Sequence, residues 1–232
     1  MLIAVRQLPF CLCAFLLSAV AGVSHGQESA TPIQADDAIS MPELRIGDRW
    51  VYQRVDLWKQ AVTWKLEQIV ESVESPNAIF RYKYLESADP GILAGSTGTM
   101  GYFMSVQAER RSGLLSGVFE AVHFPLKAGM TWTHSLKRRS FEGDVVEGEF
   151  SANAVGWEEI KVPAGTFKSM KIEHKGRWSR PEKGWSGREE MTVWYSPDAA
   201  RIVRSLHTDY DLGGHPSDKS EIQLVESRLV AR

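Results

Sequence analysis

The feature that most constrains the fold of this sequence is a reversal between two long arms with strand-like alternation. At its turn, residues 162–167, Pro163 fixes its own φ and Gly165 can take the positive φ that a reversal needs. Residues 147–160 before the turn have the pattern of a long strand. After it, charged residues alternate with an inward set, the period-two pattern of a half-buried strand: Met170, Ile172, His174 and Trp178.

Similar segments recur along the chain, separated by turn signals such as Asp89-Pro90-Gly91 and Ser196-Pro197-Asp198. They predict a mainly all-β domain, an antiparallel meander of about 10–11 strands that forms one strongly curved sheet or a partly open barrel. The expected strands are residues 50–57, 61–74, 79–86, 99–108, 114–124, 130–137, 147–160, 170–178, 189–196, 201–212 and 220–230.

One of these segments, residues 61–74, fits two patterns. Val62, Trp64 and Leu66 alternate as in a strand, whereas a helical stripe would join Val62 and Leu66 to the apolar residues that follow. The β-branched and aromatic content favours a strand with a bulge, and a helix is the alternative.

A short pattern, Leu-x-x-Gly-x-x-Trp, occurs twice, at residues 44–50 and 126–132. Each copy precedes a segment with strand-like alternation, which suggests a duplicated hairpin unit. The alternative is that both copies are ordinary strand entrances.

The N-terminus carries a targeting pattern. Arg6 is followed by an apolar stretch, residues 8–23, and then by small residues suited to cleavage between Gly26 and Gln27. We therefore predict a signal peptide (1–26), a flexible leader (27–42) and a single β-rich domain (43–232), located in the periplasm or secreted, with no membrane span after cleavage. An uncleaved anchor is the alternative. Cys11 and Cys13 lack the small preceding residues of a lipoprotein cleavage site.

Composition narrows the class of partner. Both cysteines lie in the predicted signal peptide, so the core must be stable without disulfides. The net charge is −2, and it becomes −3 when Arg6 is removed, which argues against nucleic acid as a partner. All eight tryptophans lie in the mature part, which indicates a large aromatic core or an aromatic-lined surface.

Three stretches together resemble the TapB-like family of bacterial secreted proteins of unknown function. They are Phe-Pro-Leu-x-x-Gly-x-x-Trp at residues 124–132, the turn at residues 162–167, and Val-Trp-Tyr-Ser-Pro-Asp at residues 193–198. The resemblance extends from residue 44 to the C-terminus. It implies a fold related to open β-barrel carriers of the LolA/LppX type, whose curved sheet shelters an apolar ligand. No catalytic residues come with this resemblance.

Candidate ligand-binding residues are aromatic or polar side chains near the expected inner face: His174, Trp178, Trp185 and Tyr195. His174 shares its face with apolar residues, so it is either a core histidine or the polar anchor of a ligand. Trp178 and Trp185 enclose a cationic loop that suits a sugar or an anionic headgroup, or that simply folds over a sheet edge.

The strongest metal-binding pattern is His207, Asp209 and Asp211, which alternation places on one face. We expect that face to be the solvated outer one, because Leu206, Tyr210 and Leu212 occupy the other. The sequence therefore predicts no metal site and no cofactor.

Catalytic signatures such as Gly-x-Ser-x-Gly and His-Glu-x-x-His do not occur, and no catalytic residue is assigned. The sequence favours a non-catalytic binding or carrier module for an apolar or amphipathic molecule, such as a lipid or glycolipid. An envelope interaction protein that acts through a sheet edge or the Trp185 loop is the alternative, and a hydrolase is a weaker one.

Overall fold

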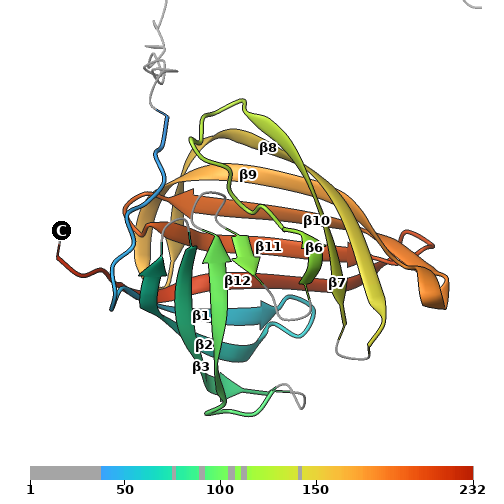
Figure 1. Ribbon diagram of the computed structural model, residues 1–232, viewed down its shortest axis with the longest axis horizontal. Coiled ribbons are helices and arrows are strands. Elements are labelled where there is room, and N and C mark those ends of the chain that lie inside the picture. Colours follow the sequence, from blue (N-terminus) through green and yellow to red (C-terminus); the bar gives the residue numbers. More distant parts are fainter. Residues whose placement is uncertain are drawn as a thin grey trace, which may run out of the picture. The chain divides into compact units, whose positions relative to one another are not determined.

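The computed structural model describes residues 38–74, 77–88, 92–103, 108–110, 114–140 and 143–231, and they form one antiparallel sheet (Figure 1). The predicted signal peptide and most of the leader lie outside these residues. The predicted all-β class and meander are confirmed. The strands are β1 (Arg49–Asp56), β2 (Ala61–Glu74), β3 (Asn77–Ser87), β4 (Thr97–Phe103), β5 (Ala108–Arg110), β6 (Leu114–Gly117), β7 (Thr131–Arg139), β8 (Val145–Val162), β9 (Gly165–Arg180), β10 (Trp185–Ser196), β11 (Arg201–Tyr210) and β12 (Pro216–Arg228).

The strand order is β5-β4-β3-β2-β1-β12-β11-β10-β9-β8-β7-β6, so the first and last strands pair at the centre of the sheet. The sheet curls strongly (Figure 1). No pairing between the two outermost strands, β5 and β6, is found among the described residues, so the sheet stays open. The arms around Pro163 and Gly165 are β8 and β9, and they pair antiparallel as predicted. We also expected such long, uninterrupted strands to lie at the centre of the sheet. This expectation is wrong, because β8 and β9 are the third and fourth strands from the β6 edge, and the long-range pairing of β1 with β12 moves the centre away from them.

Residues 61–74, whose pattern fits both a strand and a helix, form strand β2, as their β-branched and aromatic content predicts. It is irregular against both neighbours. The register with β3 shifts between Lys65 and Leu66 and again between Val70 and Ser72. These bulges break the strict alternation and so create the apparent helical period.

Both Leu-x-x-Gly-x-x-Trp copies adopt the same local structure. Gly47 and Gly129 have positive φ angles of 93° and 79°. Each glycine precedes the first strand of a hairpin and donates its backbone N–H to the second strand. Gly47 donates to the carbonyl oxygen of Val70 in β2 (2.9 Å), and Gly129 donates to that of Ala154 in β8 (2.6 Å). The two copies are therefore equivalent entrances to β1 and β7, as a duplicated hairpin unit requires.

The predicted strand 114–124 is wrong after its first residues, because β6 ends at Gly117. A side chain there would place its Cβ 2.1 Å from the Ser135 carbonyl oxygen. The chain then leaves the sheet, and its residues 118–126 cover part of one face. Leu126, within this covering segment, also pairs with Ile39 through two backbone hydrogen bonds of 2.8 and 2.9 Å, so the described end of the predicted leader is attached to the domain.

Two hydrophobic clusters form the core. One is centred on Trp50 and Phe80 and joins residues of β1–β3, β8 and β10–β12. The other lies under the covering segment and contains Leu126, Ile172 and Tyr195. Strands β8 and β9 alternate buried and exposed positions over most of their length, which explains why their sequence pattern is so clear.

Glycines at paired positions make room for aromatic rings that lie on the sheet. A Cβ on Gly176 would lie 2.2 Å from Cδ1 of Phe150 and 2.6 Å from the Glu149 carbonyl oxygen. Gly187, which pairs with Trp178, is similarly close to the indole ring of that residue. The glycines thus let Phe150 and Trp178 occupy the face that forms the candidate site.

We predict that Gly176→Ala lowers the free energy of unfolding by about 1–3 kcal/mol, because the backbone oxygen that it meets cannot rotate away. Urea unfolding of the variant measures the effect. Lys175→Ala, at the exposed neighbouring position, is the control and should change stability by about 0.5 kcal/mol or less. Equal stability of both variants would contradict the close packing of Phe150 on this strand.

Candidate functional site

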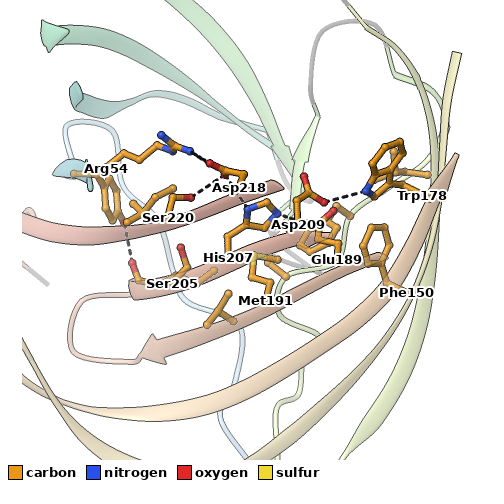
Figure 2. Close-up of a pocket in the computed structure, with 18 of the residues that line it drawn as sticks. Arg54, Phe150, Trp178, Glu189, Met191, Ser205, His207, Asp209, Asp218 and Ser220 are labelled. Carbon is orange, nitrogen blue, oxygen red and sulfur yellow. Dashed lines mark hydrogen bonds and ion pairs between the residues drawn. The ribbon is translucent and has the colours of Figure 1, made fainter. Parts of the chain in front are cut away.

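The candidate site is a cavity of about 620 Å³ lined by side chains from eight strands, β1, β2 and β7–β12. A sheet can surround one cavity from so many strands only on the side toward which it curls, so this is its inner face. Figure 2 shows side chains from β8 to β12 and from β1 directed into the same space. Apolar and aromatic residues make up much of the wall: Tyr52, Trp64, Leu66, Phe119, Leu136, Val146, Phe150, Trp178, Met191, Val193, Ile202 and Ile222.

Most charged residues of the wall lie near one end of the strands, whereas Arg201 lies at the opposite end, at the start of β11. Glu189 is near the start of β10, Asp209 near the end of β11 and Asp218 near the start of β12. Arg138 and Arg180 lie near the adjoining ends of β7 and β9. The turns that join β7 to β8, β9 to β10 and β11 to β12 are all at this end. The cavity therefore combines an apolar wall with a charged end.

A hydrogen-bonded group of side chains occupies this charged end (Figure 2). The His207 ring lies between two carboxylates, with its Nε2 2.9 Å from Glu189 Oε1 and its Nδ1 3.5 Å from Asp218 Oδ2. Asp218 accepts two hydrogen bonds from Nη2 of Arg54, at 3.0 and 3.1 Å. Asp209 Oδ1 accepts a hydrogen bond from Nε1 of Trp178 at 2.9 Å. These side chains are held in place by contacts from β1, β9, β10, β11 and β12.

The pKa values of this group reflect burial and shared charge. Burial works to lower the pKa of the His207 imidazole, but the hydrogen bond to Glu189 and the neighbouring carboxylates outweigh it, so this pKa lies above its ordinary value. Burial raises the pKa of the Asp209 carboxyl, and the negative charge of Glu189 raises it further. The end of the cavity thus has several groups that favour a bound proton or cation.

The structure distributes the four predicted ligand-binding residues over three places. Trp178 lines the cavity. His174 and Tyr195 are 1% exposed and lie in the core. His174 donates its Nε2–H to the Ala121 carbonyl oxygen at 3.1 Å, within the covering segment. Trp185 is 54% exposed, with the cations of Arg180 and Lys183 over its ring.

The register of β9 agrees with the sequence interpretation. His174 faces the core, whereas its neighbours Glu173 and Lys175 are less buried or exposed. Burial, together with the charge of His134, lowers the pKa of His174 to about 3, the direction expected from desolvation. Its surroundings are those of a core histidine.

The expected outer position of His207 and Asp209 is wrong. Both side chains line the cavity, whereas Leu206 packs against the core cluster around Trp50. Leu212, expected on the core side, is 72% exposed in the turn after β11. The assignment fails because it equated the inner face with apolar side chains, and at this end the inner face lines a cavity with charged walls.

Several cavity residues had no distinctive sequence signal. Arg54 and Leu66 belong to strands distant in sequence from β9–β11, and only the pairing of β1 with β12 brings them to the cavity. Glu189 and Asp218 lie at the ends of their strands, where charged residues are common. The one available signal was the alternation of His207 with Asp209.

A hydrolytic arrangement needs a nucleophile beside a base. Ser205 and Ser220 line the cavity near His207. Ser220 is its cross-strand partner on β12, and Ser205 precedes it by two residues on β11. The hydroxyl of Ser220 donates to Asp218 Oδ2 at 3.4 Å, and within the described part of the chain neither serine has a hydrogen bond to the His207 ring. A nucleophile hydrogen-bonded to a base is thus not formed by these residues.

Comparison with known proteins finds similarity of overall structure alone. No protein-family profile matches the chain, and no curated protein matches it. A candidate lipoprotein from Parabacteroides distasonis is 16% identical, with a TM-score of 0.49, and the match covers 83% of this chain and 100% of that one. A candidate exported protein with a YmcC-like fold from Bacteroides fragilis is 18% identical, with a TM-score of 0.47 and the same coverage of both chains.

The hypothetical lipoprotein YmcC from Escherichia coli is 10% identical, with a TM-score of 0.45 and coverage of 79% of this chain and 86% of that one. The TapB-like and LolA/LppX resemblances stay expectations, since no family profile matches. In the described residues, no helix has the length and hydrophobicity to cross a bilayer.

Proposed function

We propose that the protein is exported and acts as a non-catalytic binding or carrier module for an amphipathic molecule, such as a lipid or glycolipid, held in the inner cavity. The observation that carries this proposal is the cavity itself, with a volume of about 620 Å³ and walls from eight strands. Ligand pockets in proteins have volumes of about 300–1,000 Å³, mostly apolar walls and a few polar groups that orient the ligand.

The distribution of polar groups favours an amphipathic ligand over a purely apolar one. The apolar wall formed by residues such as Leu66, Phe150 and Met191 suits an acyl chain or a ring system. The charged end with Arg54, Asp209 and Trp178 offers hydrogen bonds and ion pairs to a headgroup. Burying the headgroup elsewhere would leave its polar atoms without partners, which costs free energy.

The cavity favours the carrier over the scaffold alternative. A scaffold protein has no need of an open inner cavity, whereas a carrier requires one. The Trp185 loop is the observation that supports a scaffold role, because an indole that is 54% exposed beside two cations is a suitable contact for a partner. A protein that retains no ligand in the test below would favour this second function.

We predict that Ser205→Trp fills the cavity and lowers its affinity for the fluorescent apolar probe N-phenyl-1-naphthylamine at least tenfold. Ser205 is half-buried on the cavity wall, so an indole at this position has space to enter the cavity. Thr208→Trp, on the opposite face of β11, is the matched control and should bind like the natural chain. Probe titration and circular dichroism measure binding and folding.

The same variants should differ in the lipid that they retain when purified from a bacterial periplasm. Native mass spectrometry and lipid extraction should find bound lipid in the natural chain and in Thr208→Trp, and little in Ser205→Trp. Absence of probe binding and of lipid in all three folded proteins, or equal binding by both tryptophan variants, would overturn the proposal.

A further inference from the structure

Three side chains of the metal-ligating type meet at the charged end of the cavity, Glu189 from β10 and His207 and Asp209 from β11. Their possible ligand atoms all lie within 4.8 Å of one another. We propose that they form a binding site for a divalent transition-metal ion, with Zn²⁺ as the ion that fits best. The ligands would be Nε2 of His207 and one carboxylate oxygen each from Glu189 and Asp209.

The cross-strand register places like charges opposite one another at this site. Glu189 is the partner of Asp209 between β10 and β11, and Asp209 is the partner of Asp218 between β11 and β12. Like charges directly opposite in a sheet are destabilising, and burial increases the cost. Three carboxylates on adjacent strands at the wall of a cavity therefore favour a bound cation.

The cations already present leave part of this charge uncompensated. Arg54 is hydrogen-bonded to Asp218, and His207 is within ion-pair distance of Glu189 and Asp218. Among the described residues, Asp209 has no cation within ion-pair distance, and the hydrogen bond that it accepts comes from the neutral indole of Trp178. A metal ion between Glu189 and Asp209 would balance both carboxylates.

The surroundings orient the ligands as metal sites require. A metal-bound histidine usually donates its other ring N–H to a carboxylate, which fixes the ring and its tautomer. Nδ1 of His207 lies 3.5 Å from Asp218 Oδ2, and Arg54 holds that carboxylate from the other side. Nε2 is thereby directed toward Glu189. The hydrogen bond from Trp178 fixes one oxygen of Asp209 and leaves the second for the ion.

The donor set selects the class of metal. One imidazole and two carboxylates suit Zn²⁺ and related transition metals, whereas Ca²⁺ and Mg²⁺ prefer oxygen ligands in larger number. Zinc ligands lie about 2.0–2.2 Å from the ion, so the three atoms must approach to about 3.3 Å from one another, a movement that the rotatable Glu189 side chain permits. Three protein ligands leave a coordination position open toward the cavity.

The test uses the full chain and Zn²⁺ alone, and therefore does not depend on the proposed amphipathic ligand. After treatment with a chelator and dialysis, calorimetric titration should show one Zn²⁺ per chain. Glu189→Gln, His207→Gln and Asp209→Asn should each weaken binding at least tenfold. Zn²⁺ should raise the melting temperature of the natural chain and not that of these variants.

His215→Gln is the matched control. It removes a second histidine that faces an aspartate, at 3.6 Å from Asp211 in an exposed turn, and it should bind Zn²⁺ like the natural chain. Circular dichroism in chelator establishes that each variant folds. Asp209→Asn should be at least as stable as the natural chain under these conditions, because it removes a like-charge contact. Failure of the natural chain to bind Zn²⁺, or equal binding by Asp209→Asn, would overturn the proposal, whether or not the cavity binds the apolar probe.

Discussion

Trp50→Ala should lower the free energy of unfolding by about 3–5 kcal/mol, the largest effect expected of a single substitution in this protein. The Trp50 side chain is 0% exposed, and its Nε1–H donates to the Ala199 carbonyl oxygen at 2.8 Å. The ring packs on Phe80, with a centroid distance of 6.0 Å, and lies under the Arg201 guanidinium. Alanine would leave a cavity and an unpaired carbonyl, and the buried Arg201 guanidinium would lose one of its two aromatic contacts, keeping the one with Phe80.

Trp58→Ala is the control for this measurement. Trp58 lies in the turn after β1 and is 56% exposed, so its removal should change the free energy of unfolding by about 0.5 kcal/mol or less. Urea unfolding followed by circular dichroism compares the two variants. A loss below about 1 kcal/mol for Trp50→Ala would mean that the core does not extend across the β1–β12 junction.

Acidification should destabilise the fold through two buried histidines, His134 and His174. Burial lowers the pKa of His134 to about 4 and that of His174 to about 3, from 6.5. Between pH 6.5 and these values the unfolded chain binds protons that the folded chain does not, so stability falls as the pH falls. At pH 5 the loss is about 2 kcal/mol for each histidine.

His207 acts in the opposite direction. Its pKa is raised in the folded chain, so its contribution to stability is present below pH 6.5 and is lost as the pH rises through the folded value. The net dependence on pH combines both effects. A substitution at one of the buried histidines separates them.

His134→Phe isolates the loss of stability on acidification that is caused by a buried histidine. The His134 ring stacks on Phe150, with an interplanar angle of 15°, and neither ring nitrogen has a hydrogen-bond partner among the described residues. Phenylalanine can therefore replace it without loss of a hydrogen bond. We expect stability within about 1 kcal/mol of the natural chain at pH 7.5, and a gain of about 1–2 kcal/mol at pH 5.

Urea unfolding at the two pH values measures this difference. His215→Gln, which changes an exposed turn residue, should leave the pH dependence nearly unaltered. A variant at position 134 with the same loss of stability on acidification as the natural chain would show that this histidine is already charged in the fold.

The sequence predicted the features that depend on neighbouring residues. Alternation identified β8 and β9 and the core position of His174, because a side-chain period of two is local information. The β-branched and aromatic residue types identified the irregular strand β2. Turn residues located the reversal at Pro163 and Gly165 for the same reason. The repeated glycine turns before β1 and β7 were visible from spacing alone.

The remaining features depend on contacts between distant segments. The pairing of β1 with β12 fixes the centre of the sheet and brings Arg54 to Asp218, and no local pattern encodes it. The departure of the chain from the sheet after Gly117 likewise depends on the approach of Ser135 from the next strand. His207 and Asp209 were assigned to the wrong face because alternation identifies a shared face and does not identify the wall of a cavity.

The pairing of the first strand with the last also determines the order in which the molecule can fold. A chain made from its N-terminus can form the hairpins of β1–β3 early, but β1 has no second neighbour until β12, residues 216–228, has been synthesised. Such long-range pairing slows folding, and until then β1 presents an unpaired edge that other chains can join. Apart from that junction, every neighbouring pair in the strand order is consecutive in sequence. The last strand therefore controls when the two halves become a single cooperative unit.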